Sequence, residues 1–435
     1  MEQPSSFSKM SKTRWLFPLI MFQAYLSLTI LLYFYGPWPW PTSDPFRLAV
    51  FLILSQIFIF VGYVGSYSHF KKRNNNLIGS SVGNALNAQR LSMIVTGIFI
   101  APTALSRSGS FIPDMISGIL SSGQAYNEFQ ALSGSFVIVE YGRIILAPLL
   151  VAFFPLTIFL WKDLSRLNKL LSTTLIFYWL SIYIASGTSK GLADFIITLP
   201  FLLVASRFWT PPKSLAWKKS LAGLIVIFFA FLMFFGEGQK GRDGGVGENG
   251  VFNDGADIIT SDRLSGLSEV LGDNQLVIYE SLTRYVVQGY YALDMAFDIE
   301  SRHTRFLGHS MFLSAQGNAV TGSTYFTDNS VPGVLEQETG YGMYSLWHSI
   351  YVWLMSDFGY FGTLLCMMVF GYSLAIFWIE SIFRPSMFSL TGLYLLLILF
   401  FYIPANNQIF QNGESTMAFL FIGFIFILKK IQRKI

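Results

Sequence analysis

The stretch that decides the fold is WLFPLIMFQAYLSLTILLYFY, residues Trp15 to Tyr35, which contains no charged side chain. An uncharged apolar run of about 20 residues is long enough to cross the hydrocarbon core of a bilayer as a helix. The run follows Lys9, Lys12 and Arg14, as the apolar part of a signal peptide would. However, it lacks a small-x-small cleavage site and a second apolar run follows, so we interpret it as a retained membrane helix.

Apolar runs of this kind recur along the whole chain. Of its 435 residues, 53% are hydrophobic and only 12% are charged, whereas a soluble domain has about 25% charged residues. We therefore predict an all-α polytopic membrane protein with about ten transmembrane helices. The expected spans are residues 15–35, 47–66, 91–105, 136–160, 170–186, 191–206, 220–236, 359–379, 387–404 and 416–429.

Basic residues flank alternate ends of these spans. Most of the 29 Lys and Arg fall in six segments: Lys9, Lys12 and Arg14; Lys71, Lys72, Arg73 and Arg90; Lys162, Arg166 and Lys169; Arg207, Lys213, Lys218 and Lys219; Arg384; and Lys429, Lys430, Arg433 and Lys434. Because cytoplasmic loops carry the excess of Lys and Arg, this pattern predicts that both termini are cytoplasmic. It indicates a multi-pass protein of the bacterial inner membrane.

Residues 237–345 form a large acidic segment that the same reasoning places in the periplasm. The segment begins with a glycine-rich stretch up to Gly250, typical of a flexible entry. Apolar residues then recur every three or four positions over 275–300, which predicts an amphipathic helix lying on the membrane surface or the bundle, or capping an active site. We therefore divide the chain into residues 1–236 with seven spans, the loop 237–345, and residues 346–435 with three more.

Residues 345–362 are apolar and aromatic but are interrupted by His348 and Asp357. Joined to the span at 359–379, they would make a helix longer than a membrane needs. We therefore expect a short interfacial or re-entrant helix before that span, a kind of backbone that is tolerated where it is buried in protein or lines a watery cavity.

Cofactor and metal motifs are missing from the sequence. The only cysteine is Cys366, so the chain has neither an intrachain disulfide nor a thiolate cluster. There is no phosphate-binding Gly-Lys-Ser/Thr loop and no H-E-x-x-H motif. The first outward loop holds a single carboxylate, Asp44, where metal-dependent polyprenyl glycosyltransferases place paired acids. We therefore expect no cofactor, no metal site and no nucleic-acid partner.

Two basic residues lie within or beside spans, where charge is costly. Arg143 falls inside the span 136–160, one helical turn from Glu140, and either forms an ion pair with it inside the bundle or faces a cavity as an anion site. We weigh these two interpretations evenly. Lys190 follows the small-residue turn Gly187 to Ser189, which is either a plain tight turn or an anion-binding nest with a lysine at its rim. The plain turn is the stronger interpretation from sequence alone.

Further polar residues cluster in the outward segments. Arg284 lies on the amphipathic stretch, where a solvated helix face is its ordinary role. His348 precedes the last group of spans and is either an interface residue or a base. Asn407 belongs to a polar cluster in the last outward loop that either binds sugar hydroxyls or is simply a polar loop.

Several of these motifs resemble a known family. Arg284-Tyr285-Val286-Val287-Gln288-Gly289-Tyr290-Tyr291, with Ala292-Leu293, resembles a stretch in the outward loop of the Wzy-type O-antigen polymerases, the oligosaccharide repeat unit polymerases. Trp347 to Ser349, Tyr351, Asp357-Phe358-Gly359, Gly362 and Gly371-Tyr372 are similar to that family too, as is the turn Gly187 to Gly191. The likeness covers scattered parts of residues 187–372 and includes the topology.

The resemblance implies glycosyl transfer on the periplasmic face. The donor is a glycan on undecaprenyl pyrophosphate, and the acceptor is a single lipid-linked repeat unit whose hydroxyl attacks the anomeric carbon. Cations must then stabilise the leaving pyrophosphate, and a base must take the hydroxyl proton. The partners so implied are these lipid-linked oligosaccharides, membrane lipids and a chain-length regulator protein.

We assign the roles as follows: Arg143, Arg284 and Lys190 hold the pyrophosphate in one cavity; His348 is the base, with Asp357 as its substitute; and Gln288, Tyr290, Tyr291 and Asn407 contact the glycan. Three alternatives remain. An O-antigen ligase would use the same donor but transfer to lipid A core. A flippase for the same lipid would show internal pseudo-symmetry and short loops. A non-catalytic scaffold would use Arg143 and Lys190 only for packing.

Overall fold

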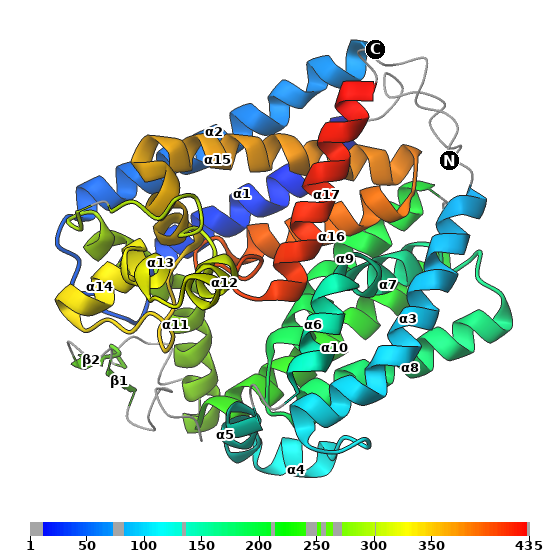
Figure 1. Cartoon of the computed structure of the whole chain (residues 1–435), viewed down its shortest axis with the longest axis horizontal. Coiled ribbons are helices and arrows are strands. Elements are labelled where there is room, and N and C mark those ends of the chain that lie inside the picture. Colours follow the sequence, from blue (N-terminus) through cyan, green and yellow to red (C-terminus); the bar gives the residue numbers. More distant parts are fainter. Residues whose placement is uncertain are drawn as a thin grey trace.

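The computed structural model describes residues 12–72, 82–132, 136–209, 214–240, 250–253, 258–263, 272–300 and 302–432. Helices make up 78% of the structure, so the predicted all-α class holds (Figure 1). The glycine-rich entry at 241–249 and the basic residues Lys9, Arg73, Lys213, Arg433 and Lys434 lie outside the described residues. The helices are α1 (Lys12–Tyr35), α2 (Pro45–Lys72), α3 (Val82–Ser108), α4 (Met115–Leu120), α5 (Ser122–Leu132), α6 (Val137–Ile145), α7 (Ala147–Phe159), α8 (Arg166–Ala185), α9 (Lys190–Trp209), α10 (Ser214–Lys240), α11 (Asp273–Ala296), α12 (Met311–Thr321), α13 (Tyr325–Asp328), α14 (Val331–Thr339), α15 (Ile350–Phe383), α16 (Met387–Tyr402) and α17 (Gly413–Gln432).

Five described helices are long and apolar enough to cross a membrane: α1, α2, α3, α9 and α15. The pair α6 and α7 adds a sixth if it is counted as one bent span. Shorter apolar helices lie within α10, α16 and α17. The protein is therefore a polytopic membrane protein by the composition of its helices, and the figure of ten spans stays a prediction.

The span expected at 136–160 is not one continuous helix. The chain breaks there into α6 and α7, which meet at 66°. Pro148 stands in the first turn of α7, and proline both lacks an amide donor and clashes with the backbone of a preceding helical turn. The helix therefore ends and begins again, and Arg143 lies in the last turn of α6 at this break.

A separate short helix was expected before the span at 359, and the structure has it, because α15 is broken at Gly359. Gly359 has φ 61° and ψ −170° in an otherwise helical run, a backbone region that is essentially open to glycine alone. The short stretch Ile350 to Phe358 therefore precedes the long part of α15 as a separate helical segment. That long part packs along α2, and the two helices lie side by side in Figure 1.

The helix α11 packs on the bundle, one of the positions expected for it. It packs against α1, α10 and α15, and its polar side chains are buried together with its apolar ones. Its contacts with the loop between α1 and α2 are specific: the Asp294 carboxylate accepts hydrogen bonds from the Ser43 backbone N–H (2.6 Å) and hydroxyl (2.9 Å). Because α11 is covered on several sides, it forms part of the bundle.

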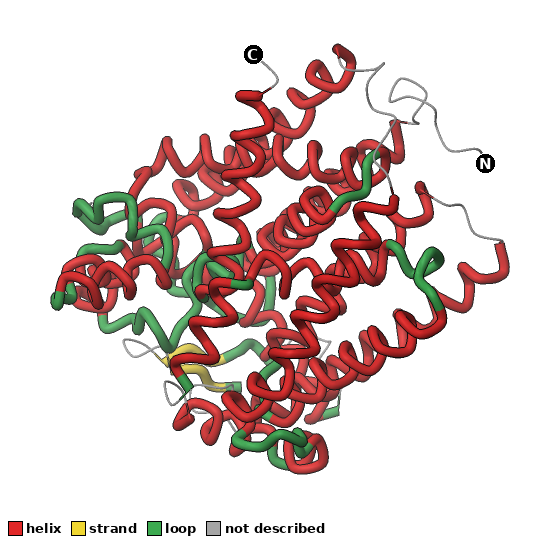
Figure 2. The backbone as a smooth tube through the Cα atoms, turned by 45° about the vertical axis from the view of Figure 1, so that its right-hand side comes forward, coloured by secondary structure: helices red, strands yellow, loops and turns green. Residues whose placement is uncertain are grey.

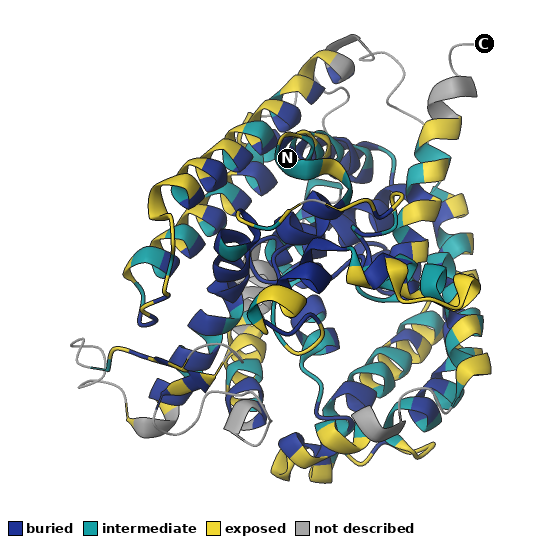
Figure 3. Ribbon diagram, turned by 60° about the vertical axis from the view of Figure 1, so that its left-hand side comes forward, coloured by how far each residue is buried: buried dark blue, intermediate teal, exposed yellow. Residues whose placement is uncertain are grey.

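In the remainder of the long segment, α14 contacts α11. A two-stranded antiparallel sheet pairs β1 (Val251–Asn253) with β2 (Ile258–Thr260), and α12, α13 and α14 follow. Figure 2 shows most of the loops gathered beside this small sheet and these short helices. In Figure 3 buried residues fill the middle of the bundle, while the outer faces of the long helices are exposed. That exposed surface is strongly apolar, as expected of a protein surrounded by lipid.

Candidate functional site

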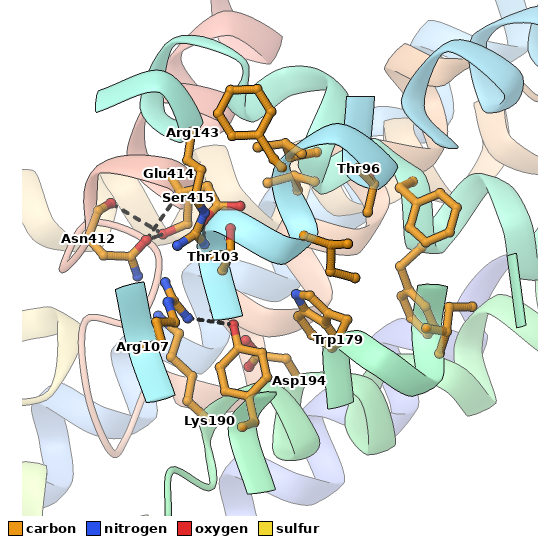
Figure 4. A pocket seen from close by; sticks show the side chains of 18 of the residues that line it. Thr96, Thr103, Arg107, Arg143, Trp179, Lys190, Asp194, Asn412, Glu414 and Ser415 are labelled. Carbon is orange, nitrogen blue, oxygen red and sulfur yellow. Dashed lines mark hydrogen bonds and ion pairs between the residues drawn. The ribbon is translucent and has the colours of Figure 1, made fainter. Parts of the chain in front are cut away.

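A cavity of about 290 Å³ lies among α3, α5, α6, α7, α8, α9, α16 and α17. Most of its wall is aliphatic or aromatic, from residues such as Phe153 and Trp179. Five charged side chains line it: Arg107, Arg143, Lys190, Asp194 and Glu414. Figure 4 shows them gathered on one side of the cavity, opposite Thr96 and Trp179. Charge is expensive between membrane helices, so such a group marks a functional site unless it is fully internally paired.

Arg143 is held between two carboxylates. One guanidinium nitrogen lies 3.2 Å from Glu140 one turn earlier in α6, and the other contacts Glu414 in the first turn of α17. The residue is only 4% exposed. The ion pair expected with Glu140 is therefore present, and so is the expected position in a cavity: the two interpretations of Arg143 describe one arrangement.

Arg107 is a cation that the sequence reasoning did not single out. It lies in the last turn of α3, donates a hydrogen bond to the Tyr183 hydroxyl (3.1 Å) and sits 5.5 Å from the centre of the tyrosine ring. Its partner is thus a neutral phenol, so its positive charge is not neutralised by that contact. A basic residue at the outward end of an apolar run was the available clue.

Lys190 is the first residue of α9 and follows the turn at Gly187. Gly187 has φ 60°, and a side chain there would collide with the Ser122 carbonyl oxygen of α5, so the turn requires glycine. Within the described part of the chain, the Lys190 ammonium forms no ion pair or hydrogen bond, although it lines the cavity. This is the arrangement that an anionic ligand would complete.

Asp194 lies one helical turn after Lys190 and was also missed from the sequence. It is 7% exposed, and its Oδ1 atom makes no hydrogen bond with any described residue. The clue was a carboxylate inside an apolar run, spaced four residues from a lysine. With Glu140 counted beside Arg143, three carboxylates face three cations, so the formal charges around the cavity balance in the absence of a ligand.

Arg284 is not part of this cavity. It is 4% exposed on α11, and its guanidinium carbon lies 4.4 Å from the centre of the Phe252 ring. Burial lowers the pKa of Arg284 to about 10, while the nearby Tyr341 acts in the opposite direction. The structure therefore brings Arg143 and Lys190 together as predicted and places Arg284 elsewhere.

The residues expected to contact glycan on α11 are engaged within the protein. The Gln288 side-chain amide donates to the Tyr341 hydroxyl (3.0 Å), and the Tyr290 hydroxyl lies 3.0 Å from that of Thr29. Tyr291 stacks on Trp40, with ring centres 5.5 Å apart. Gln288, Tyr290 and Tyr291 are all buried, and none lines the cavity.

His348 is buried away from the cavity as well. Its Nδ1 lies 3.1 Å from the Leu346 carbonyl oxygen, and its Nε2 has no hydrogen-bond partner among the described residues. Burial lowers the pKa of His348 to about 4 because the charged imidazolium would be poorly solvated. The ring is therefore neutral at pH 7, but it accepts a proton only weakly.

Asp357 and Asn407 both contact His309, a residue that was not singled out from the sequence. The Asp357 carboxylate accepts hydrogen bonds from the His309 backbone N–H (2.7 Å) and from Thr304, and lies 2.7 Å from His309 Nδ1. The Asn407 amide donates to the His309 carbonyl oxygen (2.8 Å). This cluster joins α15, the segment before α12 and the α16–α17 loop; it does not line the cavity.

Among the described residues, no group of three or more His, Cys, Asp or Glu side chains is arranged to hold a metal ion. The cavity is thus mostly apolar, with charged side chains of both signs gathered on one side of it. Comparisons of the chain with models of known protein families, with curated proteins and with solved structures found no match.

Proposed function

We propose that this protein is a membrane glycosyltransferase that polymerises oligosaccharide repeat units carried on undecaprenyl pyrophosphate. The observation that supports this most is the cavity in which Arg107, Arg143 and Lys190 meet between apolar helices. A lipid pyrophosphate presents a strongly anionic group at the end of an apolar chain. Arginine suits phosphate oxygens because its planar fork donates two parallel hydrogen bonds.

A second cavity suits the apolar part of such a lipid. It has a volume of about 430 Å³ and is lined almost wholly by apolar and aromatic side chains of α1, α9, α10, α11 and α16. Ser189 and Ala193 border it, whereas Lys190 and Asp194 border the charged cavity. The beginning of α9 therefore separates an apolar site from a cationic one, as binding of an amphipathic donor requires.

The proposed chemistry needs no nucleotide because the donor is already activated. As the bond from the anomeric carbon to pyrophosphate breaks, negative charge develops on the leaving oxygens, and the three cations would stabilise it. The leaving group would share Arg143 with Glu140 and Glu414, while Lys190 would gain a partner that it lacks among the described residues. Arg143 and Lys190 keep the roles expected from sequence, Arg107 joins them, and Arg284 has no part in this binding site.

The test is polymerisation by the purified protein in nanodiscs, with lipid-linked repeat units as substrate. We expect a ladder of products that persists in excess EDTA, and loss of long chains in Arg143→Ala and Arg107→Ala at normal protein levels. Arg143→Lys should recover only part of the activity. Arg47→Ala is the matched control, because Arg47 is an outward arginine bound to Asp298 (2.9 Å) outside the cavity.

A full ladder in both cavity variants would refute the site, and activity that EDTA abolishes and Mg²⁺ restores would refute metal independence. Lipopolysaccharide from a deletion strain separates the related functions. One repeat unit per core indicates a missing polymerase, no repeat indicates a missing ligase or flippase, and an unchanged ladder excludes all three. The proposal places the protein in the bacterial inner membrane with this cavity open towards the periplasm.

A further inference from the structure

Transfer to a hydroxyl acceptor requires a group that removes its proton, and the cavity limits which groups qualify. Neither His348 nor His309 lines it, so neither imidazole reaches a substrate bound there. Carboxylates are the remaining acceptors. Both glutamates are bound to Arg143. Glu414 contacts its Nη2 atom, and Glu140 lies 3.2 Å from its Nη1 atom. A carboxylate paired with arginine is a poor base, since the pair stabilises its charged form.

Asp194 differs from both glutamates. It is buried, it lines the cavity, and its Oδ1 has no hydrogen-bond partner among the described residues. A carboxylate oxygen without a partner in such a place costs free energy unless a ligand satisfies it. Asp194 also lies one helical turn from Lys190, so a base at this position would be close to a cation that holds the leaving group.

We propose that Asp194 is the general base that deprotonates the acceptor hydroxyl in this cavity. The assignment rests on the proposed glycosyl transfer. In the step, the acceptor oxygen forms a bond to the anomeric carbon as the bond from that carbon to the pyrophosphate oxygen breaks. The electron pair of the broken bond stays with the pyrophosphate, held by Arg107, Arg143 and Lys190. The hydroxyl proton passes to the Asp194 carboxylate.

Azide separates this role from binding of the donor. As an anion, azide attacks the anomeric carbon without giving up a proton, so its product, a glycosyl azide, forms without a base. We expect Asp194→Asn to slow chain extension by about 10²- to 10⁴-fold, the usual contribution of a general base. The same variant should form glycosyl azide within about threefold of the wild-type rate and keep its KM for the lipid-linked donor. Asp194→Glu should recover part of the chain extension.

Asp298→Asn serves as the control, because Asp298 is an exposed outward carboxylate that does not line the cavity. Chain extension by Asp194→Asn near the wild-type rate would overturn the assignment. Equal loss of extension and azide product, or a raised donor KM, would overturn it too, because Asp194 would then act on the donor or on the fold. If the wild-type protein forms azide product too slowly to measure, the kinetics of chain extension serve instead. An unchanged donor KM and a lowered kcat in Asp194→Asn, with kcat partly recovered in Asp194→Glu, would support the assignment, and any other pattern would overturn it. Failure of the wild-type protein to transfer sugar at all would instead refute the proposed function.

Discussion

Arg143 shows how a charged side chain is maintained inside a membrane bundle. Its guanidinium bridges two carboxylates from different helices, Glu140 of α6 and Glu414 of α17. Removing one partner of a buried charge pair costs more than removing both, because the remaining charge is left without compensation. The ion pair between Arg143 and Glu414 therefore joins α6 to α17, in addition to any role of Arg143 in binding.

This arrangement predicts non-additive effects on stability. Arg143→Gln should lower the free energy of unfolding by roughly 1–3 kcal/mol, since two carboxylates then face each other without a cation. The double variant Arg143→Gln/Glu414→Gln should lose less than the two single variants together. Thermal unfolding of all four proteins in detergent measures this coupling. Strictly additive losses would show that the contact does not stabilise the fold.

The lowered pKa of the buried His348 imidazole predicts that the stability of the protein depends on pH. The pKa of His348 is about 4 in the folded protein, against about 6.5 for an unperturbed histidine. Between these values the unfolded state binds more protons, so stability should fall as the pH drops from 6.5 towards 4. The loss attributable to this residue over that range is on the order of 3 kcal/mol.

The matched variant is His348→Asn, whose amide can still donate to the Leu346 carbonyl oxygen but does not titrate. Thermal midpoints measured from pH 7 to pH 4 should fall less in this variant than in the wild-type protein. Parallel curves would mean that another group causes the acid sensitivity.

At the scale of elements, the α4–α5 segment was not expected from sequence and lies beside the candidate cavity. Phe129 of α5 lines the cavity, and α5 contacts the Gly187 turn that leads to Lys190. The neighbouring α4 carries a row of exposed apolar side chains, including Ile112 just before it (81% exposed) and Leu120 (82%). Contiguous exposed apolar surface of this kind indicates contact with membrane or protein.

We predict that α4 lies within the outer surface of the bilayer, with its apolar side chains in contact with lipid. Spin labels at Ile112→Cys and Ile116→Cys, in a Cys366→Ser background, should be more accessible to oxygen than to a water-soluble nickel complex. Val320→Cys on α12, at an equally exposed apolar position (87%), should show the reverse. Greater access of the nickel complex at both positions would place this segment in water.

For the whole molecule, the two ends of α1 contact different parts of the chain. At one end, the Trp378 indole donates to the Arg14 carbonyl oxygen (2.9 Å), and Arg14 lies 5.0 Å from the ring centre of Phe208. At the other end, the loop after α1 meets α11, where the Trp38 indole donates to the Glu280 carbonyl oxygen (3.0 Å). The basic flank is thus separated from the long acidic segment by the length of α1.

We therefore predict cytoplasmic termini and a periplasmic segment 237–345. An alkaline phosphatase fusion at Glu300 should be active, and a green fluorescent fusion at the same residue should be dark. A fusion of the fluorescent protein to the C-terminus provides the positive control. Fluorescence at Glu300 without phosphatase activity would reverse the orientation.

Local sequence was sufficient to predict the membrane class, many of the helices and a separate short helix before the span at 359. These properties depend on runs of neighbouring residues: about 20 apolar side chains span a bilayer wherever they occur, and a run longer than the membrane needs implies a second helix. The structure places the break at Gly359, since a glycine permits a backbone that other residues avoid. Arg143 and Lys190 stood out for the same reason, since charge within an apolar run is costly by itself.

Only the tertiary structure decided which charged residues meet. Arg107, Lys190 and Glu414 are far apart in the chain, and they share a cavity because α3, α9 and α17 pack around the break between α6 and α7. By contrast, Arg284, which the resemblance assigned to the same cavity as Arg143, is carried by α11 to a different site beside Phe252. The side of a helix that becomes buried, and the partners it finds there, depend on non-local packing, which the spacing of residues along one chain segment does not contain.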